Sequence, residues 1–369
     1  VGQLAAQNSL RNPRRTAATA SALMLGLALV SLMSVLGSSA TASTDAAVEE
    51  TLTSQLIVSN VAGAPFSPSI ADQIREVDGI RTVAQFRNAF AEDDGRGAFV
   101  GAADPEQLAE SLDIPMLAGA LQILQPGTVI LDQQTADDRG YAVGDTVRLE
   151  FQAATVPLVV VGIFDTGGAI PANYLVTLDT LEKGGLTPLD SILFIGKDPQ
   201  VTTADIRPAV EQITEDLPTV TLQDPAEFAE SQREQINFFL YFIYALLGLA
   251  VVIAVLGIVN TLALSVIERT REIGLLRAVG LSRRQLRRMV RLESVIVAVL
   301  GAVLGVVMGV AFGVALQQAI ADQGVDVLAI PWKQLTVFVV LSAVVGVLAA
   351  VLPARRAARL DVLRAIYTE

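Results

Sequence analysis

The sequence predicts an α-helical membrane protein with four transmembrane helices and a large extracytoplasmic α+β domain between the first and the second. Three observations lead to this fold class. Of the 369 residues, 52% are hydrophobic and only 17% are charged, with a mean hydropathy of +0.53, which is too apolar for an ordinary soluble domain. Four windows without charged residues are long enough to cross about 30 Å of hydrocarbon. The long segment between the first two windows is acidic and has mixed strand and helix patterns.

The four uncharged windows cover residues 16–44, 236–267, 294–321 and 334–354. The first is expected to be a retained helix, because its apolar part is longer than the roughly 7–15 residues of a signal-peptide core. No Asp, Glu, Lys or Arg lies within the windows, which argues against an ion-coupled transporter. Asn260 and Thr261 are the most polar residues deep in a window, and hydrogen bonding between helices is the expected role.

Arginines near the ends of the windows predict the orientation. Arginines lie before the first window and after the fourth, and eight of them lie between the second and the third. Because short cytoplasmic segments are rich in Lys and Arg, both termini are expected in the cytoplasm of a bacterial cell. Residues 45–234 hold 31 acidic and 10 basic residues and are expected outside. The predicted parts are an N-terminal segment with the first helix (1–44), the external domain (45–224), a stalk with the second helix (225–267), a cytoplasmic loop (268–293), the third helix (294–321), a short external loop (322–333), the fourth helix (334–354) and a cytoplasmic tail (355–369).

The external domain has patterns of both strands and helices. Alternating and β-branched runs predict strands at 55–59, 128–132, 146–151, 156–164, 191–196 and 219–222, with a Gly144-Asp145 turn in this β-rich middle. Helices are expected at 67–77, 104–112 and 202–216, the last with Thr203 as its cap and Asp205 in its first turn. The acidic run from Glu92 to Gly95 lacks the ligand spacing of a calcium loop, and a solvated hairpin turn is expected instead.

The composition excludes most catalytic sites. The chain has no histidine and no cysteine, so the common triads, His/Cys zinc sites and disulfides cannot form. Its only Gly-Lys pair, Gly196-Lys197, is followed by Asp198 and does not form a Walker A motif. A membrane-anchored enzyme would have to rely on scattered carboxylates. We therefore expect no enzyme activity, no cofactor or metal held by this chain, and no nucleic-acid partner.

Two helices are expected to extend beyond the bilayer. Asp224-Pro225-Ala226-Glu227 combines an N-cap, a proline at the first helical position and a capping-box glutamate, so a helix should begin at Pro225. No proline follows before Ile267, which gives about 65 Å of helix, twice the hydrocarbon thickness. Residues 38–52 lack glycine and proline and could extend the first helix in the same way. The alternative is a pair of juxtamembrane linkers, because serine and threonine are weak helix formers.

The loop after the second window has an amphipathic helical pattern. Residues 268–280 form a short charged and partly apolar segment that Gly280 should end, and Ser282 with Gln285 forms a capping box for the next helix. Such a helix could fit a groove in a cytoplasmic partner, or it could be a solvated loop.

This loop resembles that of the FtsX-like permease family of ABC transporters, which includes macrolide exporters and lipoprotein-releasing permeases. The loop sequence, the tail at 353–361, the Asn12-Pro13-Arg14-Arg15-Thr16 segment, the β-rich stretch at 129–164 and the four-helix topology all carry the resemblance. It implies a permease subunit whose coupling helix rests on a cytoplasmic ABC ATPase dimer that binds the ATP, and which works with a second permease copy or a second permease half. The start of the chain resembles the second half of longer actinobacterial permeases, so a fragment of a longer permease is one expectation.

The resemblance leaves two functions open. The first is export or extrusion by mechanotransmission, in which ATP-driven movement of the external domain replaces a solute tunnel. The second is a non-transporting regulator that activates a cell-wall hydrolase. An extracytoplasmic adaptor or a hydrolase is the corresponding external partner. The size and β-rich middle of the external domain favour the exporter, and neither the substrate nor the direction of transport follows from the residues.

Three groups of residues are candidate functional sites. The resemblance implies an ATPase contact formed by Glu268, Arg271, Glu272, Ile273, Leu276, Arg277 and Gly280, although surface charges or a membrane anchor would show the same pattern. A glycine face with four-residue spacing should pack against another helix of the bundle or against a second subunit: Gly301, Gly305, Gly309 and Gly313. A basic strip should contact anionic membrane lipid or only set the topology: Arg283, Arg284, Arg287, Arg288 and Arg291.

Overall fold

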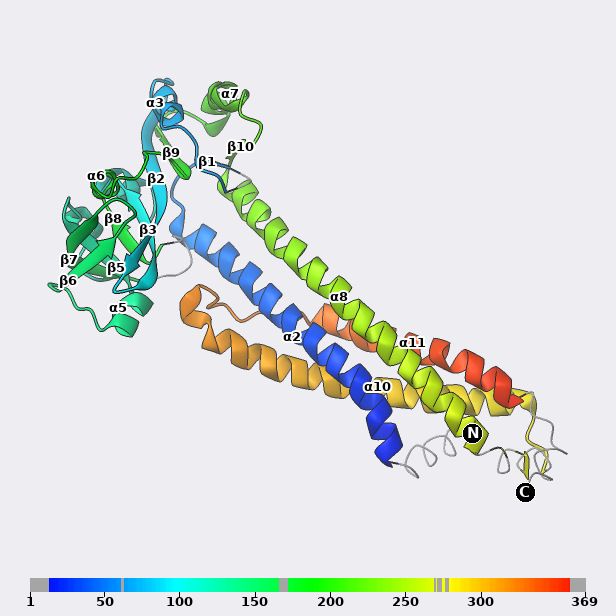
Figure 1. The fold of residues 1–369 in the computed structure, drawn as a ribbon. Coiled ribbons are helices and arrows are strands. Elements are labelled where there is room, and N and C mark those ends of the chain that lie inside the picture. Colours follow the sequence, from blue (N-terminus) through cyan, green and yellow to red (C-terminus); the bar gives the residue numbers. More distant parts are fainter. Residues whose placement is uncertain are drawn as a thin grey trace. The chain divides into compact units, whose positions relative to one another are not determined.

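The computed structural model describes residues 13–60, 63–165, 172–268, 270, 274–275 and 279–358 (Figure 1). The chain forms two compact units. The membrane unit comprises Val1–Ser39, Ile236–Ala319 and Leu328–Glu369, and the external unit comprises Ala40–Gln235 and Ile320–Val327. Two of the four boundaries between the units, after Ser39 and after Gln235, fall inside long helices, each of which contributes residues to both units.

Within the described residues, four helices are long and apolar enough to cross a membrane, as the sequence predicts. They are α2 (Pro13–Thr51), α8 (Pro225–Glu268), α10 (Arg283–Ala319) and α11 (Trp332–Ala358). The predicted start of a helix at Pro225 is confirmed. The helical extension after residue 38 is also confirmed as far as Thr51, so the alternative of a juxtamembrane linker is wrong there.

A ten-stranded sheet forms the centre of the external unit (Figure 1). Its strands are β1 (Leu56–Asn60), β2 (Ile80–Asp93), β3 (Arg96–Ala103), β4 (Met116–Ala118), β5 (Thr128–Asp132), β6 (Thr146–Glu150), β7 (Thr155–Phe164), β8 (Tyr174–Val176), β9 (Ile192–Lys197) and β10 (Val220–Gln223). The order is β10-β1-β9-β2-β3-β8-β5-β7-β4, and β6 pairs with both β2 and β7. The strands β2, β3, β8, β5, β7 and β6 therefore form a closed ring.

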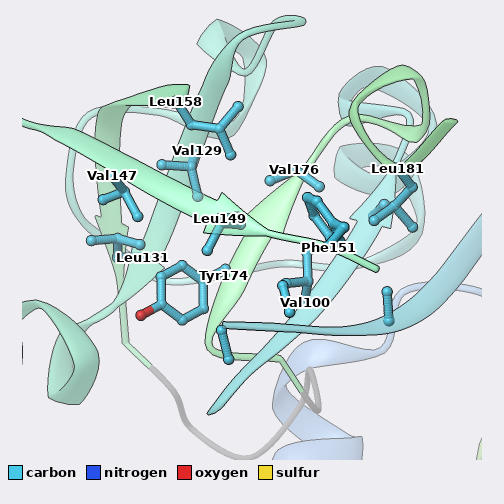
Figure 2. Packing of buried hydrophobic residues seen from close by; sticks show 14 of the residues in the cluster. Val100, Val129, Leu131, Val147, Leu149, Phe151, Leu158, Tyr174, Val176 and Leu181 are labelled. Carbon is cyan, nitrogen blue, oxygen red and sulfur yellow. The ribbon is translucent and has the colours of Figure 1, made fainter. Parts of the chain in front are cut away.

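The side chains inside this ring form a continuous apolar core (Figure 2). Val100, Val129, Val147, Leu149 and Leu158 are completely buried in it. Exposed and buried residues alternate along β6, because every second side chain of a strand points to the same face and here one face points into the ring. A separate core lies where α3 (Ser69–Arg75) and α7 (Thr203–Thr214) cover β1 and β9. The shorter helices are α4 (Pro105–Ser111), α5 (Gln133–Arg139), α6 (Leu178–Lys183), η1 (Leu121–Ile123) and η2 (Ala321–Gln323).

The acidic run after residue 91 forms the turn of the β2–β3 hairpin, as predicted. Asp93 pairs with Arg96, and both central residues have positive φ, 50° at Asp94 and 71° at Gly95, as in a type I′ turn. The expectation of a fully solvated turn is wrong for Asp93, which is only 1% exposed. Its carboxylate accepts hydrogen bonds from the hydroxyls of Tyr174 at 2.7 Å and Tyr141 at 3.1 Å. Burial, together with the hydrogen bond to Asp93, raises the pKa of Tyr174 well above its ordinary value.

Several predicted elements differ from the observed ones. The predicted strands are present with ends shifted by one residue or less, whereas β2, β3, β4 and β8 have no counterpart among the predictions. The cap of α7 is Thr202 and not Thr203. Thr202 has extended backbone angles, and its backbone N–H and its hydroxyl both donate to the Asp205 carboxylate, at 2.8 and 2.6 Å. Sequence reasoning also missed the helices α5 and α6.

Candidate functional site

The first turn of α8 is fixed in the external unit by a reciprocal pair of hydrogen bonds. Asp224 Oδ1 accepts from the Glu227 backbone N–H at 2.8 Å, and Glu227 Oε2 accepts from the Asp224 backbone N–H at 2.9 Å. Arg207 of α7 donates to both carboxylate oxygens of Glu227, at 2.8 and 3.0 Å. The carboxylates of Glu211 and Glu227 raise the pKa of Arg207. The helix start is thus attached to its neighbour α7 as well as capped.

An ion pair joins α8 to α2 within the external unit. Arg233 Nε donates to Asp45 Oδ1 at 2.6 Å, and Glu230 also accepts from Arg233. The Arg233 and Asp45 side chains are 35% and 39% exposed, so water reaches the pair. The pair is therefore expected to hold the two helices in position and to add little to the free energy of unfolding, because exposed ion pairs are weak.

Inside the membrane unit, α2 and α8 pack in opposite directions. Gly37 of α2 faces Leu240, and a methyl group at Gly26 would lie 3.4 Å from the Val251 side chain. Between these contacts the hydroxyls of Ser34 and Tyr244 lie 3.0 Å apart. The residue numbers fall along α2 as they rise along α8, which gives the antiparallel direction.

The glycine face of α10 lies directly on α2. A methyl group at Gly301 would come within 2.8 Å of the Ala20 carbonyl oxygen, one at Gly305 within 2.6 Å of the Met24 oxygen, and one at Gly313 within 3.4 Å of the Leu32 oxygen. At Gly309 the same group would collide with the Ala28 oxygen. Both helices advance by four residues between contacts, so α2 and α10 run parallel. The structure therefore places another helix of the same bundle, α2, against this face.

The loop between α8 and α10 begins and ends on packed helix ends. Val266 near the end of α8 packs against Leu286 and Met289 of α10. Gly274 and Leu275 have helical backbone, and the Val279 N–H donates to the Leu275 carbonyl at 3.0 Å. Gly280 has a φ of 110°, which favours glycine and agrees with the predicted stop.

The capping box that follows the loop is present as predicted. The Ser282 hydroxyl accepts from the Gln285 backbone N–H at 3.3 Å, and the Gln285 side chain accepts from the Ser282 N–H at 2.9 Å. The helix α10 therefore starts at Arg283 directly after the loop.

The predicted ATPase-contact residues are described only in part. Glu268 and Gly280 lie in described segments, whereas Arg271, Glu272, Ile273, Leu276 and Arg277 lie outside the described residues.

The structure adds two candidates for the ATPase contact that sequence reasoning missed. Leu275 and Val279 are apolar residues four positions apart, and their side chains are 53% and 88% exposed. That spacing places them on one helix face and was visible in the sequence. They are the exposed apolar residues of the described part of the loop.

All five arginines of the predicted basic strip lie on the first turns of α10. Arg283, Arg284 and Arg288 are exposed, and Arg287 and Arg291 are half-buried. In the described part of the chain, no group of three or more acidic side chains is arranged to hold a metal ion. The described arrangement thus combines long packed helices, a loop with exposed apolar residues and a cationic helix end.

Two known families match different parts of the chain. Residues 16–216 match the MacB-like periplasmic core domain, and residues 244–362 match the FtsX-like permease C-terminal domain. The first match covers more than half of the chain. The order of the two matches follows the order of the external unit and the last three long helices.

Curated relatives show the same similarity. The ABC transporter permease YtrF of Bacillus subtilis is 33% identical over 179 residues, which cover 43% of this chain and 40% of YtrF. The macrolide export ATP-binding/permease protein MacB of Rhodospirillum rubrum is 27% identical over 400 residues, which cover 99% of this chain and 60% of that protein. The ABC transporter permease Rv0987 of Mycobacterium tuberculosis is 25% identical over 213 residues, with 55% and 23% covered. The chain thus spans less than two thirds of the length of these relatives.

Solved structures are similar to part of the chain. The periplasmic region of MacB from Actinobacillus actinomycetemcomitans is 12% identical, with 50% of this chain and 94% of that chain covered and a TM-score of 0.39.

Proposed function

This chain belongs to the FtsX-like permeases of ABC transporters that carry a MacB-like periplasmic core domain, and from this membership we propose that it couples ATP hydrolysis on a separate ATPase to movement of its periplasmic domain. Both matched segments are permease parts, so the chain is a permease subunit and not an enzyme. The movement serves export by mechanotransmission: the periplasmic domain is displaced while no solute passes between the four helices.

One observation carries this proposal most directly, the continuity of α8. The helix runs unbroken from its capped start at Pro225 to Glu268, the first residue of the loop. Its 44 residues correspond to about 66 Å, roughly twice the hydrocarbon thickness. A continuous hydrogen-bonded helix without internal proline resists bending, so a displacement at one end reaches the other.

The proposed working complex contains a cytoplasmic ABC ATPase dimer and a second permease copy or permease half. ATP binds to the ATPase and not to this chain. Both termini and the loop lie in the cytoplasm in this proposal, because arginines flank these ends while the segment at residues 45–234 is acidic. An extracytoplasmic adaptor is the corresponding external partner of an exporter.

Crosslinking tests the ATPase contact. The chain has no native cysteine, so Leu275→Cys and Val279→Cys each place a single thiol on the described part of the loop. Both variants are expected to crosslink to a co-expressed partner ABC ATPase. Thr187→Cys in the external unit is the matched control and should not. Absence of crosslinks from both loop positions in an intact complex would remove the coupling assignment.

A proline in α8 tests the transmission step. Gln232→Pro removes one backbone hydrogen bond in the external part of α8 and costs about 3 kcal/mol or more of local helix stability. The expected result is normal assembly and normal loop crosslinking with lost export, whereas Gln232→Ala should behave as the parent. If the proline variant exports at the parental rate, α8 is only a tether and does not transmit the movement.

A further inference from the structure

The five arginines at the start of α10 form a one-sided cationic strip that the proposed coupling does not use. At about 100° per residue, Arg283, Arg284, Arg287, Arg288 and Arg291 point within one arc of roughly 140°. The buried side chains of the same turns, Leu286, Met289 and Val290, point outside that arc. The strip is thus a separate face of the helix, distinct from the face that packs on Val266.

In the described part of the chain, no ion pair joins a carboxylate to an arginine of this strip. Among the described residues, the ion pairs of arginine involve Arg75, Arg81, Arg87, Arg139, Arg207 and Arg233, and none involves the strip. Arg287 Nε donates to the Arg283 carbonyl oxygen at 3.3 Å, and Arg291 Nε is enclosed without a hydrogen-bond partner. Five like charges within about 12 Å of helix repel one another, so the strip favours a bound anion.

A further arginine lies at the same level of the bundle. Ser294 donates to the Gly346 carbonyl at 2.8 Å, which fixes the antiparallel register of α10 and α11. Counting nine residues from each partner places Arg355 of α11 opposite position 285 of α10. Arg355 is exposed. Positive charge therefore comes from two helices at this end of the membrane unit.

The depth of the strip corresponds to the lipid headgroup layer. The uncharged stretch of α10 begins at Ser294, so Arg291 lies about 4.5 Å before it and Arg287 about 10 Å before it. The headgroup layer is roughly 5–8 Å thick on each side of the hydrocarbon. Arg287, Arg288 and Arg291 therefore begin at or next to this layer, and their long side chains can reach into it.

The strip also lies on the same face of α10 that α2 covers further toward the C-terminal end of that helix. Gly301, Gly305, Gly309 and Gly313 point within the same arc as the arginines and lie on α2. From the contact of Gly301 with Ala20, seven residues back along these parallel helices lead to Ser294 and to Pro13, the first described residue of α2. The arginines thus continue the glycine face of α10 beyond the first described residue of α2.

We propose that the strip binds the phosphate groups of anionic phospholipids in the cytoplasmic leaflet and thereby fixes the α10 end of the coupling loop. Guanidinium groups bind phosphate through paired hydrogen bonds, which suits a strip made of arginine without lysine. Because Leu286 and Met289 pack against Val266, the bound lipid also holds the end of α8. The lipid contact does not depend on the proposed coupling to an ATPase and can be tested without one.

Lipid binding by the purified chain tests this proposal. The chain is placed in phosphatidylcholine nanodiscs with and without phosphatidylglycerol, and the retained phosphatidylglycerol is measured by native mass spectrometry. The triple variant Arg287→Gln, Arg288→Gln and Arg291→Gln keeps Arg283 and Arg284 as topology signals. At about 1 kcal/mol for each arginine, its affinity for phosphatidylglycerol should fall about a hundredfold. The corresponding lysine variant should lose less, because it keeps the charges.

A matched control and two contrary outcomes define the test. Arg81→Gln, Arg96→Gln and Arg148→Gln remove three exposed charges from the external unit and should leave phosphatidylglycerol binding unchanged. In the parent, binding should weaken as salt is raised. Parental phosphatidylglycerol binding by the glutamine variant overturns the proposal. If that variant keeps the lipid and loses a co-purifying ATPase, the strip binds an acidic protein surface and the lipid assignment is wrong.

Discussion

At the scale of single residues, an added side chain on the glycine face of α10 should have a large effect. Gly305→Leu places a side chain against the Met24 carbonyl oxygen, to which even a methyl group would come within 2.6 Å. Backbone atoms cannot move aside as a flexible side chain can, so α2 and α10 must separate. We expect a loss of about 1–3 kcal/mol of stability and reduced assembly, measured by thermal unfolding and gel filtration in detergent.

Gly248→Leu is the matched control for this prediction. A methyl group at Gly248 of α8 has no neighbouring atom within 4 Å in the described structure, so the same change should be tolerated. Equal stability of the two variants would show that close contact between α2 and α10 is not needed for packing.

Asp93 is the second residue with a sharp expectation. Its buried carboxylate accepts hydrogen bonds from Tyr141 and Tyr174, and the Arg139 guanidinium lies 3.7 Å away. Asp93→Asn keeps an acceptor and removes the charge, which should destabilise the external unit by about 1–3 kcal/mol in urea unfolding. Asp94→Asn changes the exposed neighbour in the same turn and should cost less than about 0.5 kcal/mol. Similar losses from both changes would contradict the role of the buried hydrogen bonds.

At the scale of elements, the Arg233–Asp45 ion pair should keep α2 and α8 in register outside the membrane. Asp45→Arg places two like charges together, and we expect reduced export and reduced ATPase stimulation in the reconstituted complex. Adding Arg233→Asp restores the pair with its charges exchanged. Both steps are made in a Glu230→Gln background, because Glu230 also accepts from Arg233 and would repel the new aspartate. Failure of the exchanged pair to recover activity would show that the two charges act independently.

The elements also show where prediction from the sequence succeeds and where it fails. The start of α8 and the start of α10 are predictable, because Asp224 with Glu227 and Ser282 with Gln285 mark them through local hydrogen bonds. The strands β2 and β3 are hard to predict, because their inward positions carry alanines, which have weak strand preference: Ala89, Ala91 and Ala98. Small side chains there suit the inside of a closed ring, and closure depends on strands far apart in the sequence.

In the candidate site, too, the local pattern could be predicted from the sequence, whereas the partner and the exposure of the residues could not. The glycine face follows from its spacing, but its partner α2 does not, since four-residue spacing marks a helix as closely packed without saying which helix packs on it. The exposure of Leu275 and Val279 is likewise a property of the folded loop, although their spacing is local.

At the scale of the whole molecule, the distribution of charge predicts which parts reagents can reach. Thr187→Cys should react with a membrane-impermeant maleimide in intact cells with a permeable outer layer. Val279→Cys, which lies in the arginine-flanked loop, should react only after the membrane is opened. Both side chains are exposed, so a difference in labelling reports the side of the membrane. Labelling of Val279→Cys in intact cells would reverse the proposed orientation.

The pairing of β1 has a consequence for how the chain folds during its synthesis. In the described structure β1 pairs with β9 and β10, and β9 begins about 130 residues after β1 ends. At roughly 5–20 residues per second, the ribosome needs on the order of ten seconds to supply those partners. During that interval Leu56, Ile57 and Val58, which end up completely buried, belong to a strand with two open edges. This early segment therefore keeps apolar side chains and both strand edges unpaired until β9 and β10 have been synthesised.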